Sequence, residues 1–170
     1  MNNTAVRLPL AVVIFICWIA LSSLLLFYLG NRYIGSFSAT FDWGSPTLEI
    51  QALGVQPERG FQLVHVFAKH CVCNARAKAH LTQLTQQLLL PTKSQSTIST
   101  ATLAAAGFRL PATPAVLIFS DGKLIYAGPY ASGAACAVQD SLIAPILKQE
   151  LILPGLWLNG NVNTCRCPLS

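Results

Sequence analysis

Near its N-terminus the chain runs for 22 residues, 8–29, without a charged side chain. At about 1.5 Å of rise per residue, a helix of this length reaches ~33 Å and crosses a bilayer core of about 30 Å. A cleaved signal peptide has a shorter apolar region that ends in small residues, whereas this run ends in the bulky Phe27, Tyr28 and Leu29. We therefore expect an uncleaved transmembrane helix over residues 8–30, preceded by a cytoplasmic segment of residues 1–7.

The charges beside this helix indicate its orientation only weakly. Arg7 and the terminal amine precede the span, and Arg32 follows it, so the positive-inside bias is slight. The short N-terminal segment favours a cytoplasmic N-terminus. We expect a single-pass protein of a bacterial inner membrane with its folded part in the periplasm, where cysteine pairs can form disulfides. The reverse orientation would place the same cysteines in a reducing cytosol.

The roughly 140 residues that follow are enough for one domain with its own core. The sequence predicts a linker over residues 31–46, a domain over residues 47–148 and a C-terminal tail over residues 149–170. The net charge of +5 comes from scattered residues without a basic stripe, which argues against nucleic-acid binding. The membrane, reached through residues 8–30, is one expected partner, and the sequence leaves the oligomeric state open.

Hydrophobic patterns predict alternating strands and helices in this domain. Residues 77, 81, 84 and 88 form an apolar stripe at helical spacing before Pro91. Asp121 and Gly122 form a two-residue hairpin signal between two apolar runs. We expect strands at 47–53, 61–68, 96–99, 114–119 and 123–127, and helices at 74–90, 102–106 and 134–147. This order predicts an α/β fold with a central mixed sheet flanked by helices.

Two cysteine pairs of identical spacing, Cys71/Cys73 and Cys165/Cys167, dominate the chemistry of the sequence. The first pair lies where the strand at 61–68 gives way to the helix at 74–90. A helix N-terminus favours a thiolate, and residues 69–78 include four basic side chains and no carboxylate. A thiol whose pKa falls from ~8.5 to ~6.5 is about 75% ionised at pH 7. The pattern therefore indicates a reactive cysteine, with a buried cysteine beside a solvated basic face as the alternative.

Two segments resemble the thioredoxin family. Residues 63–71, LVHVFAKHC, look like the strand that leads into the reactive cysteine, and residues 113–123, TPAVLIFSDGK, resemble the segment from the cis-proline to the hairpin turn. The resemblance covers roughly residues 47–148, and the anchor makes the whole chain similar to membrane-tethered bacterial thioredoxin-like proteins. It implies a thioredoxin-like sheet, protein thiols or disulfides as partners, and no cofactor.

The resemblance also implies roles for single residues. Cys71 would be the attacking thiol, and the bond before Pro114 would be cis, with the Thr113 backbone pairing with a substrate chain. His65 stands where thioredoxins usually carry a buried carboxylate, so its imidazole would move a proton or would be a satisfied core histidine. His70 would stabilise the thiolate or join a metal, whereas we expect His80 on the surface.

The chain departs from the family pattern at its cysteines. One residue, not two, separates Cys71 from Cys73, and Asn74 stands where a resolving cysteine is expected. Cys71 and Cys73 can join only through a strained, non-helical turn. Cys165 or Cys167, on a mobile tail, would otherwise resolve or relay a mixed disulfide, or bridge the tail to the domain. We expect Cys136 to be buried.

The sequence thus predicts a membrane-anchored thiol-disulfide oxidoreductase whose catalytic residues are Cys71, Cys73, His65 and His70. A first alternative is a protein that binds or delivers copper or zinc through Cys71, Cys73, Cys165 and Cys167, since thiolates are strong ligands for both metals. A second alternative is a redox-inactive thioredoxin-like interaction module. The direction of electron flow, the partner's identity and the disulfide connectivity stay open at this level.

Overall fold

The computed structural model describes residues 4–38, 42–44 and 47–169. The chain divides into two compact units, Met1–Arg32 and Tyr33–Ser170, which are described separately. The described part of the first unit, residues 4–32, lies in the helix α1, Thr4–Tyr33. Within it, Pro9–Gly30 has a mean hydropathy of 2.8 and no buried residues, and no other helix in the described ranges is long and apolar enough to span a membrane. The predicted N-terminal apolar helix is confirmed.

A five-stranded mixed sheet organises the second unit, in the order β3-β2-β5-β6-β7. β2 pairs parallel to β3, β6 pairs parallel to β7, and the pairs β2–β5 and β5–β6 are antiparallel. Its strands are β2 Phe61–Val66, β3 Gln95–Ile98, β5 Ala115–Ser120, β6 Lys123–Gly128 and β7 Trp157–Leu158. The helices of this unit are α2 Asn74–Leu88, α3 Thr100–Ala105 and α4 Ile143–Leu147, with 3-10 turns at η1 Ile50–Leu53, η2 Thr92–Ser94 and η3 Val138–Asp140.

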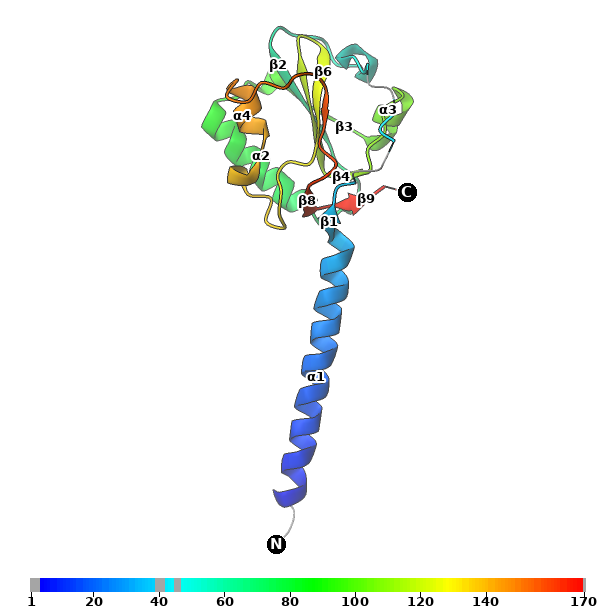
Figure 1. Ribbon diagram of the computed structural model, residues 1–170, viewed down its shortest axis with the longest axis vertical. Coiled ribbons are helices and arrows are strands. Elements are labelled where there is room, and N and C mark those ends of the chain that lie inside the picture. Colours follow the sequence, from blue (N-terminus) through cyan, green and yellow to red (C-terminus); the bar gives the residue numbers. More distant parts are fainter. Residues whose placement is uncertain (1–3, 39–41, 45–46, 170) are drawn as a thin grey trace. The chain divides into compact units, whose positions relative to one another are not determined.

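Helices cover both faces of this sheet (Figure 1). In β5, Leu117 and Phe119 face a core that includes Leu103 of α3, whereas Ile118 faces a core with α2 and α4. All three β5 side chains have no exposed surface. Burial on both faces explains why this strand reads as a continuous apolar run in the sequence.

Two small ladders lie outside the main sheet, and both use the C-terminal segment. β1 Ile34–Ser36 pairs antiparallel with β8 Asn163–Cys165, and β4 Ala112–Thr113 pairs antiparallel with β9 Cys167–Pro168. Residues expected in a linker also enter the core, where Phe37 and Trp43 are buried. The folded unit is therefore larger than residues 47–148, and the C-terminal residues are held in ladders, not in the mobile tail that we expected.

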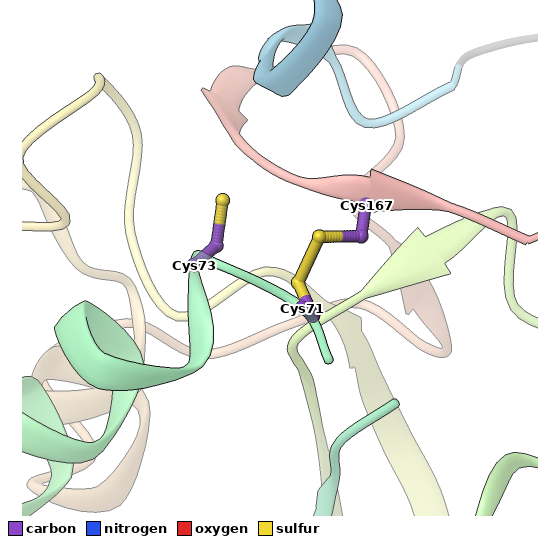
Figure 2. Close-up of side chains that lie close together, drawn as sticks. All are labelled: Cys71, Cys73 and Cys167. Carbon is purple, nitrogen blue, oxygen red and sulfur yellow. A yellow bond between two sulfur atoms is a disulfide. The ribbon is translucent and has the colours of Figure 1, made fainter. Parts of the chain in front are cut away.

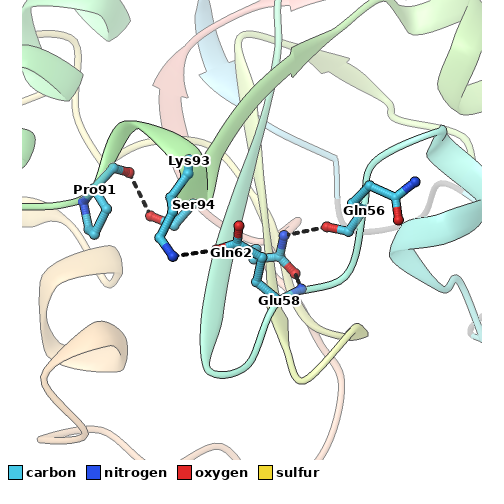
Figure 3. A network of polar contacts seen from close by, with 6 residues as sticks. All are labelled: Gln56, Glu58, Gln62, Pro91, Lys93 and Ser94. Carbon is cyan, nitrogen blue, oxygen red and sulfur yellow. Dashed lines mark hydrogen bonds and ion pairs between the residues drawn. The ribbon is translucent and has the colours of Figure 1, made fainter.

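A polar network fixes the chain before β2 (Figure 3). The buried Gln62 side chain accepts a hydrogen bond from the backbone of Glu58 at 2.8 Å and donates one to the carbonyl of Gln56 at 2.9 Å. The Glu58 carboxylate lies 3.6 Å from Lys93 Nζ in η2. Gln62 thereby satisfies its buried amide and sets the entry into the strand that leads to Cys71.

Two predicted elements are wrong. Residues 47–53 form no strand: Ile50 and Leu53 enter the core from the 3-10 turn η1, which ends at Gly54 with φ 73°. Of the helix predicted over 134–147, only α4 is an α-helix: Cys136 adopts a left-handed backbone with φ 55°, and Val138–Asp140 form the 3-10 turn η3. Local helix and strand propensity is a weak guide that tertiary contacts override. The strands and helices predicted at 61–68, 74–90, 96–99, 102–106, 114–119 and 123–127 are confirmed with small shifts of their ends.

Candidate functional site

The first cysteine pair lies in the connection between β2 and α2. Cys73 is the N-cap residue of α2, and its carbonyl accepts the hydrogen bond of Ala77 N at 3.1 Å. Asn74 Nδ2 donates to the carbonyl of Ala68 at 2.8 Å, which closes the turn on itself. Cys73, and not Cys71 as we expected, therefore stands at the helix N-terminus.

The second cysteine pair meets the first one across two disulfides. Cys71 is bonded to Cys167 and Cys73 to Cys165, with Cα–Cα distances of 5.9 and 5.7 Å. The strained bridge within a pair does not form. The ladders explain the pairing: β9 brings Cys167 beside β4, and β8 holds Cys165 opposite Ile34 of β1.

The two bridges lie side by side. The sulfurs of Cys71, Cys73 and Cys167 all lie within 4.8 Å of one another, and Figure 2 shows the Cys73 side chain beside the Cys71–Cys167 bridge. Cys73 is 1% and Cys165 5% exposed, whereas Cys71 is 8% exposed and Cys167 is half-buried. We call Cys71–Cys167 the outer bridge and Cys73–Cys165 the inner bridge.

The expected neighbours of Cys71 are present. The bond between Thr113 and Pro114 is cis, as predicted, and Cys71 Sγ lies 3.6 Å from the carbonyl oxygen of Thr113. A sulfur in a disulfide carries no proton, so this is a contact that becomes a hydrogen bond only when Cys71 is a thiol. Thr113 is also the register partner of Cys167.

His65 and His70 differ in their surroundings. His65 is 2% exposed, and its Nδ1 lies 2.7 Å from the Tyr130 hydroxyl, while its Nε2 has no partner among the described residues. Burial lowers the pKa of His65 to about 4. His65 is therefore neutral at pH 7. His70 is exposed, with φ 60°, directly before Cys71.

Arg76 supplies a contact that sequence reasoning missed. Its Nη1 donates to Cys165 Sγ at 3.4 Å and to the carbonyl of Ala134 at 2.9 Å. The sequence indicated only that Arg76 belongs to the basic segment around Cys71, and no sequence pattern relates it to Cys165. A cation at this distance favours a thiolate on Cys165 whenever the inner bridge opens.

The expectation of a surface His80 is wrong. His80 is 2% exposed, and its Nδ1 lies 3.0 Å from the carbonyl of Cys136. Burial lowers the pKa of His80, against the raising effect of that carbonyl. Its position between Ala77 and Leu84 on one helix face could have revealed this. Cys136 is a buried free thiol, as predicted, and burial raises its pKa to about 11.

The cysteines also form a candidate soft-metal site once both bridges are reduced. Tetrahedral zinc with Zn–S bonds of about 2.3 Å separates its ligand sulfurs by about 3.8 Å. The sulfur of Cys73 lies within 4.8 Å of the sulfurs of Cys71 and Cys167, which are bonded to each other, so after reduction these three thiols would lie near enough to share one ion. Cys165, bonded to Cys73, would be the fourth ligand.

Comparisons with known proteins identify a family. The family model described as a domain of unknown function, DUF6436, matches residues 43–169, which include all four bridging cysteines. The match covers about three quarters of the chain, so the chain belongs to that family. No curated protein and no solved structure matched the chain.

Proposed function

We propose that this member of the DUF6436 family is a membrane-anchored thiol-disulfide oxidoreductase that acts on protein partners through the Cys71–Cys167 bridge. The observation that carries the proposal is the juxtaposition of two disulfides, with the sulfurs of Cys71, Cys73 and Cys167 within 4.8 Å of one another. Disulfide exchange needs a sulfur close to a disulfide, and this arrangement provides it within the chain.

A second bridge adds less to the stability of the fold than the first one, and this difference supports a chemical role for the pair. The bridge between Cys71 and Cys167 closes 96 residues, and the chain-entropy model gives about 4.7 kcal/mol for a loop of ~100 residues. Once it is formed, the inner bridge closes a ring of only about six residues, which gives about 2 kcal/mol in the same model. One bridge therefore supplies most of the stability that two could give.

A thioredoxin-like fold belongs to the same proposal. The order β3-β2-β5-β6, with α2 after β2 and α3 after β3, is the arrangement that the resemblance leads one to expect. The contact of Cys71 with Thr113 agrees with the roles carried over from that family. These features support the resemblance, and the exchange chemistry is the claim to be tested.

The proposed reaction begins from the oxidised protein. A partner thiolate attacks Cys71 Sγ, the sulfur–sulfur bond to Cys167 breaks, and its electron pair leaves as the Cys167 thiolate, which takes up a proton. A second partner thiolate then attacks the partner's sulfur in the mixed disulfide and expels the Cys71 thiolate. The partner's two thiols become a disulfide, and Cys71 and Cys167 become thiols. The reverse sequence reduces a partner disulfide.

Thiol-disulfide exchange can also connect the two bridges once the outer one is open. The Cys167 thiolate attacks Cys73 Sγ, a Cys73–Cys167 bond forms, and the Cys165 thiolate leaves. Arg76 Nη1, 3.4 Å from Cys165 Sγ, stabilises that leaving group. The reaction is an isomerisation, so it needs no further oxidant or reductant.

The same proposal places the folded unit outside the cytoplasm, in the periplasm of a bacterium. Disulfides persist in such oxidising compartments, and the apolar stretch Pro9–Gly30 is long enough to anchor the chain in an inner membrane. Its protein partners would meet the outer bridge there.

Exchange with a dithiol peptide tests the proposal. Full-length protein in detergent is mixed with a reduced dithiol peptide and quenched with N-ethylmaleimide, and mass spectrometry identifies the opened bridge and the oxidised peptide. We expect the outer bridge to open first and the Cys71→Ser variant to be inactive. The Cys17→Ala variant, altered in α1, is the matched control and should retain full exchange. Activity that survives in Cys71→Ser would refute the assignment.

Binding of a soft metal by the reduced cysteines is the second candidate function, favoured by the cluster of Cys71, Cys73 and Cys167. Fully reduced protein would then compete with a chelator for Cu(I) or Zn(II) and would lose the metal in the Cys165→Ser/Cys167→Ser variant. If the reduced protein binds neither metal, metal binding is excluded and disulfide exchange is the remaining candidate function. Failure of both assays would favour a redox-inactive interaction module.

A further inference from the structure

We infer that the segment from Cys167 to Leu169 occupies a docking edge of this protein, namely the edge of β4 on which a partner protein binds. The partner would bind as an extended strand along β4, with its cysteine in the place of Cys167 and an apolar side chain two residues later. The inference rests on the proposed function and names the kind of partner segment that the outer bridge accepts.

The backbone of the C-terminal segment follows β4 as a bound strand would. Thr113 pairs with Cys167 and Ala112 with Pro168, and Leu169 N donates to the carbonyl of Pro111 at 3.0 Å. The Cys167 sulfur is bonded to Cys71 at the same time. A mixed disulfide between Cys71 and a partner strand on β4 would have the same two elements, a backbone ladder and a sulfur–sulfur bond.

Among the described residues, β4 pairs with no strand other than β9. If the C-terminal segment leaves, Ala112 and Thr113 present unpaired backbone groups beside Cys71, whose Sγ lies 3.6 Å from the Thr113 carbonyl oxygen. Free strand edges bind extended peptides by adding a strand, and side-chain pockets along the edge supply the specificity.

An apolar cavity beside the edge supplies such a pocket. It has a volume of about 440 Å³, and its lining includes Leu103, Ala104, Phe108, Leu110 and Leu169. Leu169 is half-buried there against the core. When the C-terminal segment leaves, the place of Leu169 at the wall of this cavity becomes free for an apolar side chain two residues after the partner's cysteine.

The inner bridge limits how much of the chain must move. Cys165 is bonded to Cys73 and lies in β8, which pairs with β1. Opening the outer bridge therefore frees only the residues after Cys165, while the inner bridge and β8 keep the rest of the segment in place. The released Cys167 stays tethered two residues from Cys165, which raises its effective concentration near Cys71 and lets it displace the partner afterwards.

A peptide that copies residues 163–169, with serine in place of Cys165, tests this inference. Its cysteine is activated with thionitrobenzoate, whose release reports attack by Cys71 in full-length Cys17→Ala/Cys167→Ser protein. Since a buried leucine contributes through its apolar area, we expect the peptide to react about 10-fold faster than one with aspartate in the place of Leu169. Leu169→Asp in the protein should have the opposite effect and accelerate the copying peptide, because the competing segment is weakened.

Variants of α3 locate the pocket. Ala104 lines the cavity and Ala105 does not, and both side chains are exposed. We expect Ala104→Trp to remove most of the difference in reaction rate between the copying peptide and the aspartate peptide. The Ala105→Trp variant should retain this difference. Equal rates for both peptides, or the same effect of both tryptophans, would overturn the inference.

A reaction with oxidised glutathione distinguishes failure of this inference from failure of the proposed function. Glutathione is too small to require pairing with β4. If Cys71 reacts with glutathione but does not distinguish the peptides, only the docking edge is wrong. If Cys71 reacts with neither, the proposed function fails. Covalent dimers in which Cys167 of one copy joins Cys71 of another, seen on non-reducing gels of reoxidised wild-type protein, would overturn the partner assignment in favour of a second copy of this chain.

Discussion

Arg76 Nη1 lies 3.4 Å from Cys165 Sγ, at the inner of two adjacent disulfides. A guanidinium cannot be deprotonated in a protein, so its hydrogen bond to the sulfur strengthens when the bridge opens and Cys165 becomes a thiolate. Arg76 therefore favours the reduced form of the inner bridge. The effect is moderated by solvent because the side chain is exposed.

Replacing Arg76 should lower the reduction potential of the inner bridge. In Arg76→Gln the thiolate loses its charged donor, and we expect a fall of about 15–30 mV, a three- to tenfold change in the equilibrium constant. Redox titration with mass spectrometry of each bridge measures it. Lys78→Gln, also on α2 but over the Phe67 ring, is the matched control. An unchanged or higher potential in Arg76→Gln would show that the contact does not stabilise the thiolate.

Removal of the two bridges should destabilise the fold non-additively. Whichever bridge remains still closes the long loop, so Cys71→Ser/Cys167→Ser and Cys73→Ser/Cys165→Ser should each lose about 2 kcal/mol. The variant without both bridges should lose about 7 kcal/mol. Urea unfolding of the four proteins completes the cycle. Additive losses would mean that the bridges do not share one loop closure.

Acid should destabilise the folded unit through His65. Its pKa is about 4 in the fold, against 6.5 in the unfolded chain, so the unfolded state binds more protons between these values. Stability should therefore fall by up to about 1.4 kcal/mol per unit as the pH drops from about 6.5 to about 4. His65→Gln should flatten this slope in urea unfolding at several pH values. His80, whose pKa is also lowered, accounts for a remaining slope, and an unchanged slope would contradict the assignment.

Cys136 should resist alkylation in the native protein. With a pKa of about 11, it carries about 200-fold less thiolate at pH 8 than an ordinary thiol of pKa ~8.5, and burial hinders access further. We expect iodoacetamide to label Cys136 only after unfolding in urea, as measured by peptide mass spectrometry. Rapid native labelling would show that this thiol is accessible and belongs among the reactive groups.

Local patterns were sufficient for much of the fold. The strand ending before Cys71, the helix from Asn74 and the hairpin at Asp121 depend on residues close in the sequence, and all three are present. The segments around Ile50 and Cys136 were misassigned because burial and a left-handed backbone, both imposed by distant contacts, override local propensity.

The candidate site depended on contacts that no local pattern encodes. The sequence identified the two cysteine pairs and the proline, but the partners in each bridge are 96 and 92 residues apart, and their pairing follows from the ladders β1–β8 and β4–β9. The contact of Arg76 with Cys165 escaped prediction for the same reason, since Cys165 approaches α2 only in the folded unit.

Redox titration of the wild-type protein tests the central claim most directly. Full-length protein is equilibrated in dithiothreitol buffers of known potential, trapped with N-ethylmaleimide, and each bridge is quantified by mass spectrometry. The account predicts that Cys71–Cys167 opens before Cys73–Cys165 and at a potential above about −250 mV, within the range of exchange proteins. If both bridges opened together, and only below about −300 mV as structural disulfides do, the claim that the outer bridge exchanges with partners would be contradicted.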